Sequence, residues 1–114
     1  MKKAFLLFLF INLIISCEKF DNTCNCENPL EDIAWLKELK NSMTNCYCER
    51  SIFQATYNKQ TVFYTVMTDP VCDGVINISL ADCNGNILKT YTAIDETFTN
   101  EVTERKILYR CKTN

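Results

Sequence analysis

The sequence predicts an α+β domain in which one N-terminal helix packs on an antiparallel sheet of four or five strands. Three observations lead to this expectation. Apolar residues first recur at helical spacing, and after residue 48 their period changes to two, which favours strands. A helix followed by a run of strands, without βαβ alternation, is typical of the α+β class. The chain also has 8 cysteines in 114 residues, which favours a small fold stapled by disulfides.

Composition sets limits on the class of protein. A chain of 114 residues is long enough for one domain. Without Lys2 and Lys3 it carries 10 basic and 14 acidic residues, a net charge near −4 with no electrostatic footprint for nucleic acid. The chain has no histidine, so it lacks the commonest general base and the commonest metal ligand.

The first sixteen residues have the pattern of an export signal. Two lysines precede a twelve-residue apolar run, residues 4–15, which would span about 18 Å as a helix, short of the roughly 30 Å bilayer core. A cleaved signal is therefore expected. The run ends in Ser16 and then Cys17, which is similar to a bacterial lipobox. We expect Cys17 to carry diacylglycerol on its thiol and palmitate on its amine, since two or more chains anchor a protein stably. The alternative is that Cys17 is the first of eight disulfide cysteines.

This interpretation divides the chain into a lipoprotein signal peptide (1–16), a tether (17–27) and a single α+β domain (28–114). The tether is polar and acidic. The expected location is the bacterial cell envelope, lipid-anchored and on the outer membrane, with the periplasmic or surface face left open.

The domain opens with a strong helix-start signal. Asn28 suits the N-cap, Pro29 suits the first helical position, and Glu31 is placed to reach back to the cap N–H. The helix is expected from about Pro29 to about Thr44, with Trp35 beside its apolar stripe. The stripe, which we expect to pack on the sheet, comprises Leu30, Ile33, Leu36, Leu39 and Met43.

Strands are expected over residues 52–57 and 61–67, joined as a hairpin by Asn58-Lys59. A third strand is expected over 75–80, and Asn84-Gly85 turns the chain into a fourth over 87–91. Residues 95–104 are polar and predict a loop, and 107–110 predict a short last strand.

The segment from Asn28 to Leu39 resembles the opening motif of a family of small, uncharacterised lipoproteins from Bacteroidota, which read Asn-Pro-Leu-Glu-Asp, two residues, Trp-Leu. The resemblance covers roughly residues 28–88 and continues in short turn and strand motifs: Ile52, Tyr57-Asn58, Phe63-Tyr64, Cys72-Asp73 and Asp82-Cys83-Asn84-Gly85-Asn86. There is no counterpart of the family's later Gly-rich segment. The resemblance implies an envelope lipoprotein and carries no activity with it.

The remaining cysteines are disulfide candidates: Cys24, Cys26, Cys46, Cys48, Cys72, Cys83 and Cys111. Two C-x-C pairs flank the predicted helix, so about 24 Å separates them, which disfavours a single zinc site. The oxidising envelope also favours disulfides. No metal or cofactor is expected.

Strand order narrows the pairing. Successive strands run in alternating directions between the two ends of the sheet, which places Cys72 at the same end as Cys46 and Cys48. We therefore expect Cys72 to bond either Cys46 or Cys48, which leaves the other of those two free. Cys24 and Cys26 are expected to bond Cys83 and Cys111 in an order left open.

The function most consistent with these features is a non-catalytic envelope lipoprotein that acts as a protein-binding or accessory module. Its partners would be the membrane, through the lipid anchor, and a protein not identified by the sequence. The alternative is a thiol-redox or metal-handling protein, based on the spare thiol; an inhibitor-like domain rests on fold analogy alone. The paired acids Asp95-Glu96 suit acid–base chemistry in principle but are expected to be a solvated face.

Overall fold

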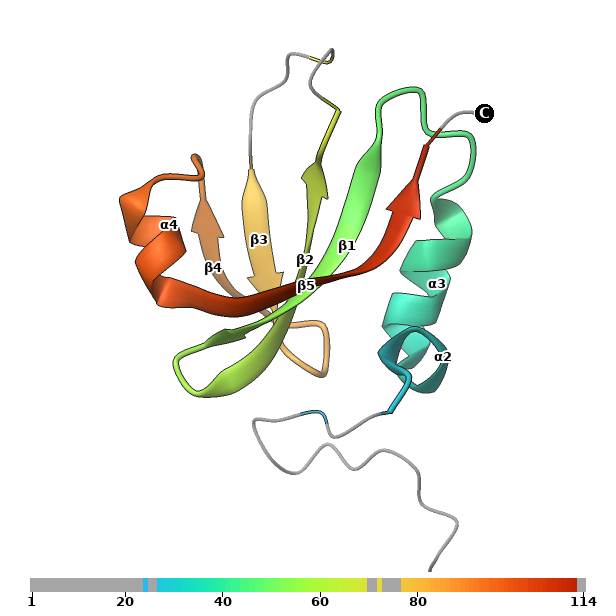
Figure 1. The fold of residues 1–114 in the computed structure, drawn as a ribbon. Helices are drawn as coiled ribbons and strands as arrows, with labels where there is room; N and C mark the ends of the chain where they lie inside the picture. The colour runs from blue at the N-terminus through green and yellow to red at the C-terminus, as the bar shows by residue number, and fades with distance from the viewer. Residues whose placement is uncertain (1–23, 25–26, 70–71, 73–76, 113–114) are drawn as a thin grey trace, which may run out of the picture.

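A computed structural model describes residues 24, 27–69, 72 and 77–112. Two short helices, α2 (Pro29–Asp32) and α3 (Ala34–Ser42), precede the strands β1 (Arg50–Tyr57), β2 (Gln60–Met67), β3 (Ile78–Ala81) and β4 (Ile87–Tyr91). A further helix, α4 (Glu96–Glu101), leads into β5 (Val102–Cys111). The strands form one antiparallel sheet in the order β4-β3-β2-β1-β5 (Figure 1). The predicted α+β class is confirmed.

The predicted single helix over 29–44 is wrong in one respect, because the chain breaks at Ile33. This residue has extended backbone angles (φ −102°, ψ 113°) and a side chain with no exposed surface. Burial of Ile33 offsets the interrupted helical ladder. Asp32, rather than Glu31, reaches back to the N–H of Asn28, at 3.2 Å, and α3 ends at Ser42.

The β1–β2 hairpin forms as the sequence predicts. Asn58 and Lys59 both have positive φ, 51° and 65°, as a type I′ turn requires, and they connect strands in continuous register from Arg50↔Met67 to Tyr57↔Gln60. β4 has its predicted bounds, and β1 and β2 begin one or two residues earlier than expected. The expected residues 75 and 76 of the third strand lie outside the described residues.

A hydrophobic core lies on each face of the sheet. α2 and α3 cover one face, as expected, and enclose a core made of Cys24, Leu30, Ile33, Leu36, Met43, Ile52, Phe63, Cys83 and Cys111. Alternate residues point to the other face and pack with Phe98 of α4 in a second core made of Ala55, Val62, Tyr64, Ile78, Leu80, Tyr91, Phe98 and Val102. The second core therefore includes Phe98 from a helix that the sequence analysis did not anticipate.

The expected loop over 95–104 contains α4 and the first residues of β5. Asp95 caps α4, because its Oδ1 accepts a hydrogen bond from the N–H of Phe98 at 3.0 Å. β5 then starts opposite Tyr57, at the hairpin turn, and ends with Cys111 opposite Arg50. The last strand is thus longer than the predicted 107–110 and runs in the opposite direction to the one expected.

Candidate functional site at a disulfide-clamped end of the sheet

Three disulfides cross-link the described residues. They join Cys24 to Cys83, Cys46 to Cys111 and Cys48 to Cys72, with Cα–Cα distances of 5.8, 5.7 and 6.0 Å. The bond from Cys72 to one of Cys46 and Cys48 was expected, and so was a bond from Cys24 to either Cys83 or Cys111. The structure selects Cys48 for the first and Cys83 for the second.

Two expectations about the cysteines are wrong. Cys111 bonds Cys46 instead of Cys24 or Cys26, and consequently neither Cys46 nor Cys48 has a free thiol. The cause is the direction of β5, which brings Cys111 beside the start of β1, where the chain leaves α3. Cys17 and Cys26 lie outside the described residues.

The two cross-links of the second C-x-C pair clamp one end of the sheet. This end, where β1 begins and β2 and β5 finish, is called the Tyr47 end below. Cys46 is tied to β5, and Cys48 to the segment that follows β2, while Tyr47 between them is 89% exposed. The backbone on each side of an almost fully exposed aromatic ring is thus covalently fixed.

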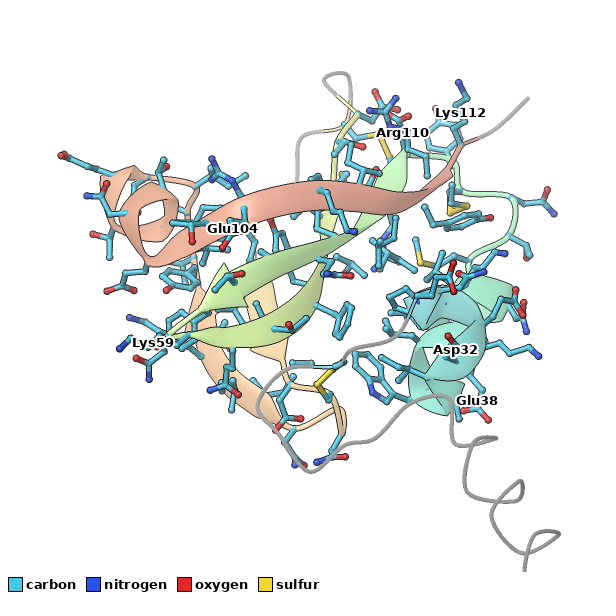
Figure 2. The ribbon with its side chains drawn as sticks, turned by 60° about the horizontal axis from the view of Figure 1, so that its bottom comes forward. Asp32, Glu38, Lys59, Glu104, Arg110 and Lys112 are labelled. Carbon is cyan, nitrogen blue, oxygen red and sulfur yellow. A yellow bond between two sulfur atoms is a disulfide. The ribbon has the colours of Figure 1, made fainter. Side chains whose placement is uncertain are left out.

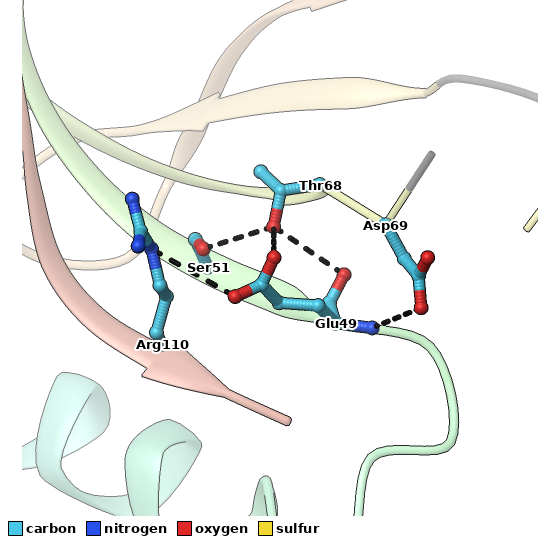
Figure 3. A network of polar contacts seen from close by, with 5 residues as sticks. All are labelled: Glu49, Ser51, Thr68, Asp69 and Arg110. Atoms are coloured by element: carbon cyan, nitrogen blue, oxygen red, sulfur yellow. Dashed lines mark hydrogen bonds and ion pairs between the residues drawn. The ribbon is translucent and has the colours of Figure 1, made fainter. Parts of the chain in front are cut away.

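A polar network joins three chain segments at the Tyr47 end (Figure 3). The Thr68 hydroxyl donates to Glu49 Oε2 at 3.2 Å, so at the 3.2 Å contact between Ser51 and Thr68 the Ser51 hydroxyl is the donor. Glu49 Oε1 also lies 3.9 Å from Arg110 Nε, and Asp69 accepts the Glu49 N–H at 3.4 Å. Both carboxylates are therefore occupied within the network.

The network has a structural role rather than a catalytic one. Ser51 has no exposed surface, so its hydroxyl is closed to an external substrate, and the residues link the start of β1 to the ends of β2 and β5. Figure 3 shows the side chain of Arg110, from β5, and that of Thr68, from the segment after β2, converging on Glu49.

Cations and apolar surface lie next to this network. Arg50 pairs in register with both Met67 and Cys111, and Lys112 follows directly. Met67 is 42% exposed, and among the described residues no ion pair involves Arg50 or Lys112. Figure 2 shows Arg110 and Lys112 at this end and Lys59 at the hairpin turn, far from them. Arg50 and Met67 share the face that α2 and α3 cover, whereas Arg110, which lies opposite Ser51, points to the other face. The name Tyr47 patch is used below for the residues gathered at this end of the sheet, on both of its faces: Tyr47, Arg50, Met67, Arg110 and Lys112.

A second polar cluster lies between β4 and α4. Glu101 Oε1 accepts hydrogen bonds from Lys89 Nζ at 2.8 Å and from the Tyr91 hydroxyl at 2.5 Å. Hydrogen bonding by Lys89, and then by Tyr91, lowers the pKa of Glu101. Burial, with the same hydrogen bond to Glu101, raises the pKa of Tyr91. These contacts latch α4 onto β4 beside the ring contact of Tyr91 with Phe98, so the cluster has a structural role.

The remaining candidates from the sequence also have structural positions. Trp35 packs against the first core, as expected, and Asp95 caps α4. Among the described residues no group of His, Cys, Asp or Glu side chains is arranged to hold a metal ion, and no helix is long and apolar enough to cross a bilayer.

The sequence analysis considered Cys46-Tyr47-Cys48 only for its two disulfide-forming cysteines. The signal for the Tyr47 patch was present: one aromatic residue between two cysteines that must bond different partners. Arg50, Met67, Arg110 and Lys112 carry no such signal, because only the register of three strands brings them together. Comparisons of the chain with protein-family models, curated proteins and solved structures found no match.

Proposed function

We propose that this protein is a non-catalytic binding module, held on the bacterial envelope by a lipid at Cys17, that contacts a partner protein. The observation that supports binding is Tyr47, which is 89% exposed and is clamped by a disulfide on each side. Tyr and Arg are the residues most often found where truncation costs an interface much of its affinity. The polar clusters described above, in contrast, are used for capping and for joining strands.

The disulfides support an exported location. All six described cysteines are cross-linked, and such bonds persist in oxidising compartments such as the envelope. The lipobox-like residues before Cys17 add the mode of attachment. The resemblance at Asn28 to Leu39 points to the same class of lipoprotein.

Mass spectrometry of the protein expressed in a Bacteroidota host tests the anchor. Residues 1–16 should be absent and Cys17 should carry acyl chains. A Cys17→Ala variant should move from the membrane fraction to the soluble fraction or remain uncleaved. A mature protein with unmodified Cys17, or with Cys17 in a disulfide, would contradict the proposal.

Thiol titration separates this proposal from the redox alternative. A binding module of this kind should show no fast-reacting thiol in the native, oxidised protein. A thiol that reacts rapidly near neutral pH, which indicates a lowered pKa, would favour the redox alternative instead.

A further inference from the structure

The end of the sheet opposite the Tyr47 end carries two turns. Asn58 and Lys59 connect β1 to β2 there, and residues 82–86 connect β3 to β4. Phe63 of β2 pairs with Ala81 of β3, which puts both turns at the same end of the sheet. Figure 1 shows α2 at this end as well. We call it the tether end, because the chain enters the domain here.

The Cys24–Cys83 disulfide fixes the tether to this end. Cys24 is buried in the first core and is bonded to the turn that follows β3. It is the seventh residue after Cys17, so the chain between the two cysteines reaches about 25 Å at most when fully extended. A lipid on Cys17 would therefore keep the Cys83 turn within that reach of the lipid headgroups.

β4 begins beside this disulfide with two exposed apolar side chains. Ile87 is 59% exposed and Leu88 is 39% exposed, and they follow Cys83 closely in the chain. Several large hydrophobic side chains are exposed in the described part of the chain, but only these two are adjacent in sequence. β4 is also an edge strand, so no other described strand of the sheet lies beyond it. We call Ile87 and Leu88 the β4 corner.

An irregularity in the pairing interrupts the alternation of side chains at the β4 corner. The register sets Ile87 opposite Ala81 and Lys89 opposite Leu80, so β4 has one extra residue here, as in a β-bulge. Alternation therefore does not assign Ile87 and Leu88 to opposite faces. A flat surface that lies across the end of a sheet can in addition meet side chains from either face, whereas a partner lying along one face cannot.

The tether favours a bilayer as the occupant of the β4 corner. A domain linked to the membrane by so few residues meets the lipid surface at a high effective concentration, and even a small apolar contact is then populated. Apolar side chains are accepted at the boundary between headgroups and acyl chains. The β4 corner thus has the position and the chemistry of a lipid contact.

The charges exposed at the tether end distinguish between lipids. Glu27, Glu31 and Asp32 are exposed where the chain enters α2, and Lys59 is exposed at the hairpin turn. Figure 2, in which this end is turned towards the viewer, shows Asp32 and Lys59. Acids outnumber the cation in this set, and like charges repel, so an anionic lipid surface is disfavoured. The contact therefore suits zwitterionic headgroups.

We propose that the β4 corner lies on the membrane, with Ile87 and Leu88 inserted among zwitterionic headgroups. This inference rests on the proposed lipid anchor at Cys17 and adds a second, non-covalent contact with the same bilayer. Because the tether end then faces the lipid, the Tyr47 end faces away from the membrane, where it is accessible to a partner protein.

A tryptophan placed at the β4 corner tests the contact. The acylated full-length protein is reconstituted in phosphatidylcholine vesicles that contain lipid brominated near the top of one acyl chain. Trp35→Phe removes the one tryptophan of the chain, and Ile87→Trp or Ile94→Trp then supplies a new one. Ile94 is the matched control, because it is an exposed isoleucine that follows the other end of β4. Emission from position 87 should shift to shorter wavelength and be quenched, and emission from position 94 should do neither.

The native Trp35 gives a second measurement, which is needed because tryptophan itself favours membrane interfaces. Trp35 lies against Gly85, in the turn that precedes the β4 corner. Energy transfer from Trp35 to dansyl-headgroup lipid should fall when Ile87→Asp and Leu88→Asp are combined. Ile94→Asp should leave the transfer unchanged. Each variant is first checked for the three disulfides and a native circular dichroism spectrum.

The possible failures can be told apart. Protein that floats with the vesicles but shows equal quenching at positions 87 and 94, or transfer that the paired aspartates do not reduce, would overturn the contact and leave the anchor intact. Failure to float would refute the anchor and the contact with it. A spectral shift at position 87 that arises in detergent solution and grows with protein concentration would mean that a second copy covers the β4 corner. Stronger quenching in phosphatidylglycerol vesicles would overturn the assigned lipid chemistry.

Discussion

The indole N–H of Trp35 donates a hydrogen bond to the carbonyl oxygen of Cys83, 3.0 Å away, and so joins α3 to the turn between β3 and β4. The ring also lies against Gly85, where an added Cβ would be 3.5 Å from the indole. The turn itself is fixed by Asp82, whose Oδ1 accepts the N–H groups of residues 84 and 86 at 2.9 Å each. The side of the sheet that meets the tether is thus held by one ring, one carboxylate and one disulfide.

Replacing Trp35 tests this junction. Trp35→Phe keeps an aromatic ring but leaves the Cys83 carbonyl unpaired, and should lower the free energy of unfolding by about 1–2 kcal/mol. Trp35→Ala also removes packing against Phe63 and should cost roughly 3 kcal/mol. Urea unfolding followed by far-UV circular dichroism measures both, with the exposed Tyr47→Phe as the control. A Phe variant as stable as the parent would show that the hydrogen bond contributes nothing.

The disulfide connectivity predicts which cross-link matters most. Removing the Cys46–Cys111 pair by double alanine substitution opens a loop with a sequence separation of 65, against 24 for Cys48–Cys72. Chain entropy puts the first at about 4.3 kcal/mol and the second at about 3.5 kcal/mol. Urea unfolding of the two double variants gives the order. Peptide mapping without reduction checks the pairing, and a peptide linking Cys24 to Cys111 would contradict it.

Asp95 is expected to be a cap with a measurable contribution. Asp95→Ala removes the acceptor for the Phe98 N–H and should destabilise the protein by about 1 kcal/mol. Asp95→Asn is the matched control, because asparagine caps equally well, and it should restore most of that loss. Thermal unfolding of the pair measures the difference. Equal loss of stability in both variants would mean that Asp95 stabilises the protein through its charge rather than through the capping hydrogen bond.

Stability should fall at alkaline pH because of Tyr64. Burial raises its pKa from 10.0 to about 12, while Arg105 opposes the shift. A pKa raised in the folded state gives stability that is present in full below pH 10, where unfolded tyrosine is neutral, and that is lost as the pH rises towards about 12. Tyr64→Phe should flatten this loss in urea unfolding at increasing pH. Tyr91, whose pKa is also raised, should leave a residual slope.

Local signals were sufficient for the first hairpin and for β4. Asn58-Lys59 and Asn84-Gly85 predict the turns at their positions, and the period-two pattern gives the correct faces of β1 and β2. These features depend on neighbours in sequence, which is why the sequence specifies them.

The errors came from tertiary effects. Ile33 interrupts a good helical pattern because its burial outweighs the ladder, and residues 95–104 look like a loop because only Phe98 and Val102 among them face a core. With α4 missed, β5 was given the wrong direction, and Cys111 was therefore assigned to the wrong end. The Tyr47 patch could not be predicted for the same reason, since its residues come from three segments brought together by register.

The three disulfides also form one continuous covalent route through the chain. From Cys24 the route crosses to Cys83, follows ten intervening residues of backbone to Cys72 and crosses to Cys48. It then passes through Tyr47 to Cys46 and crosses to Cys111. Stretched between Cys24 and Cys111, even an unfolded chain could therefore extend only about 45 Å along its backbone plus the three cross-links, instead of about 300 Å. A pulling force applied between the tether and Cys111 would be borne by the three disulfides and the short backbone segments that connect them. The segments α2 and α3 lie outside this route and would not be under tension.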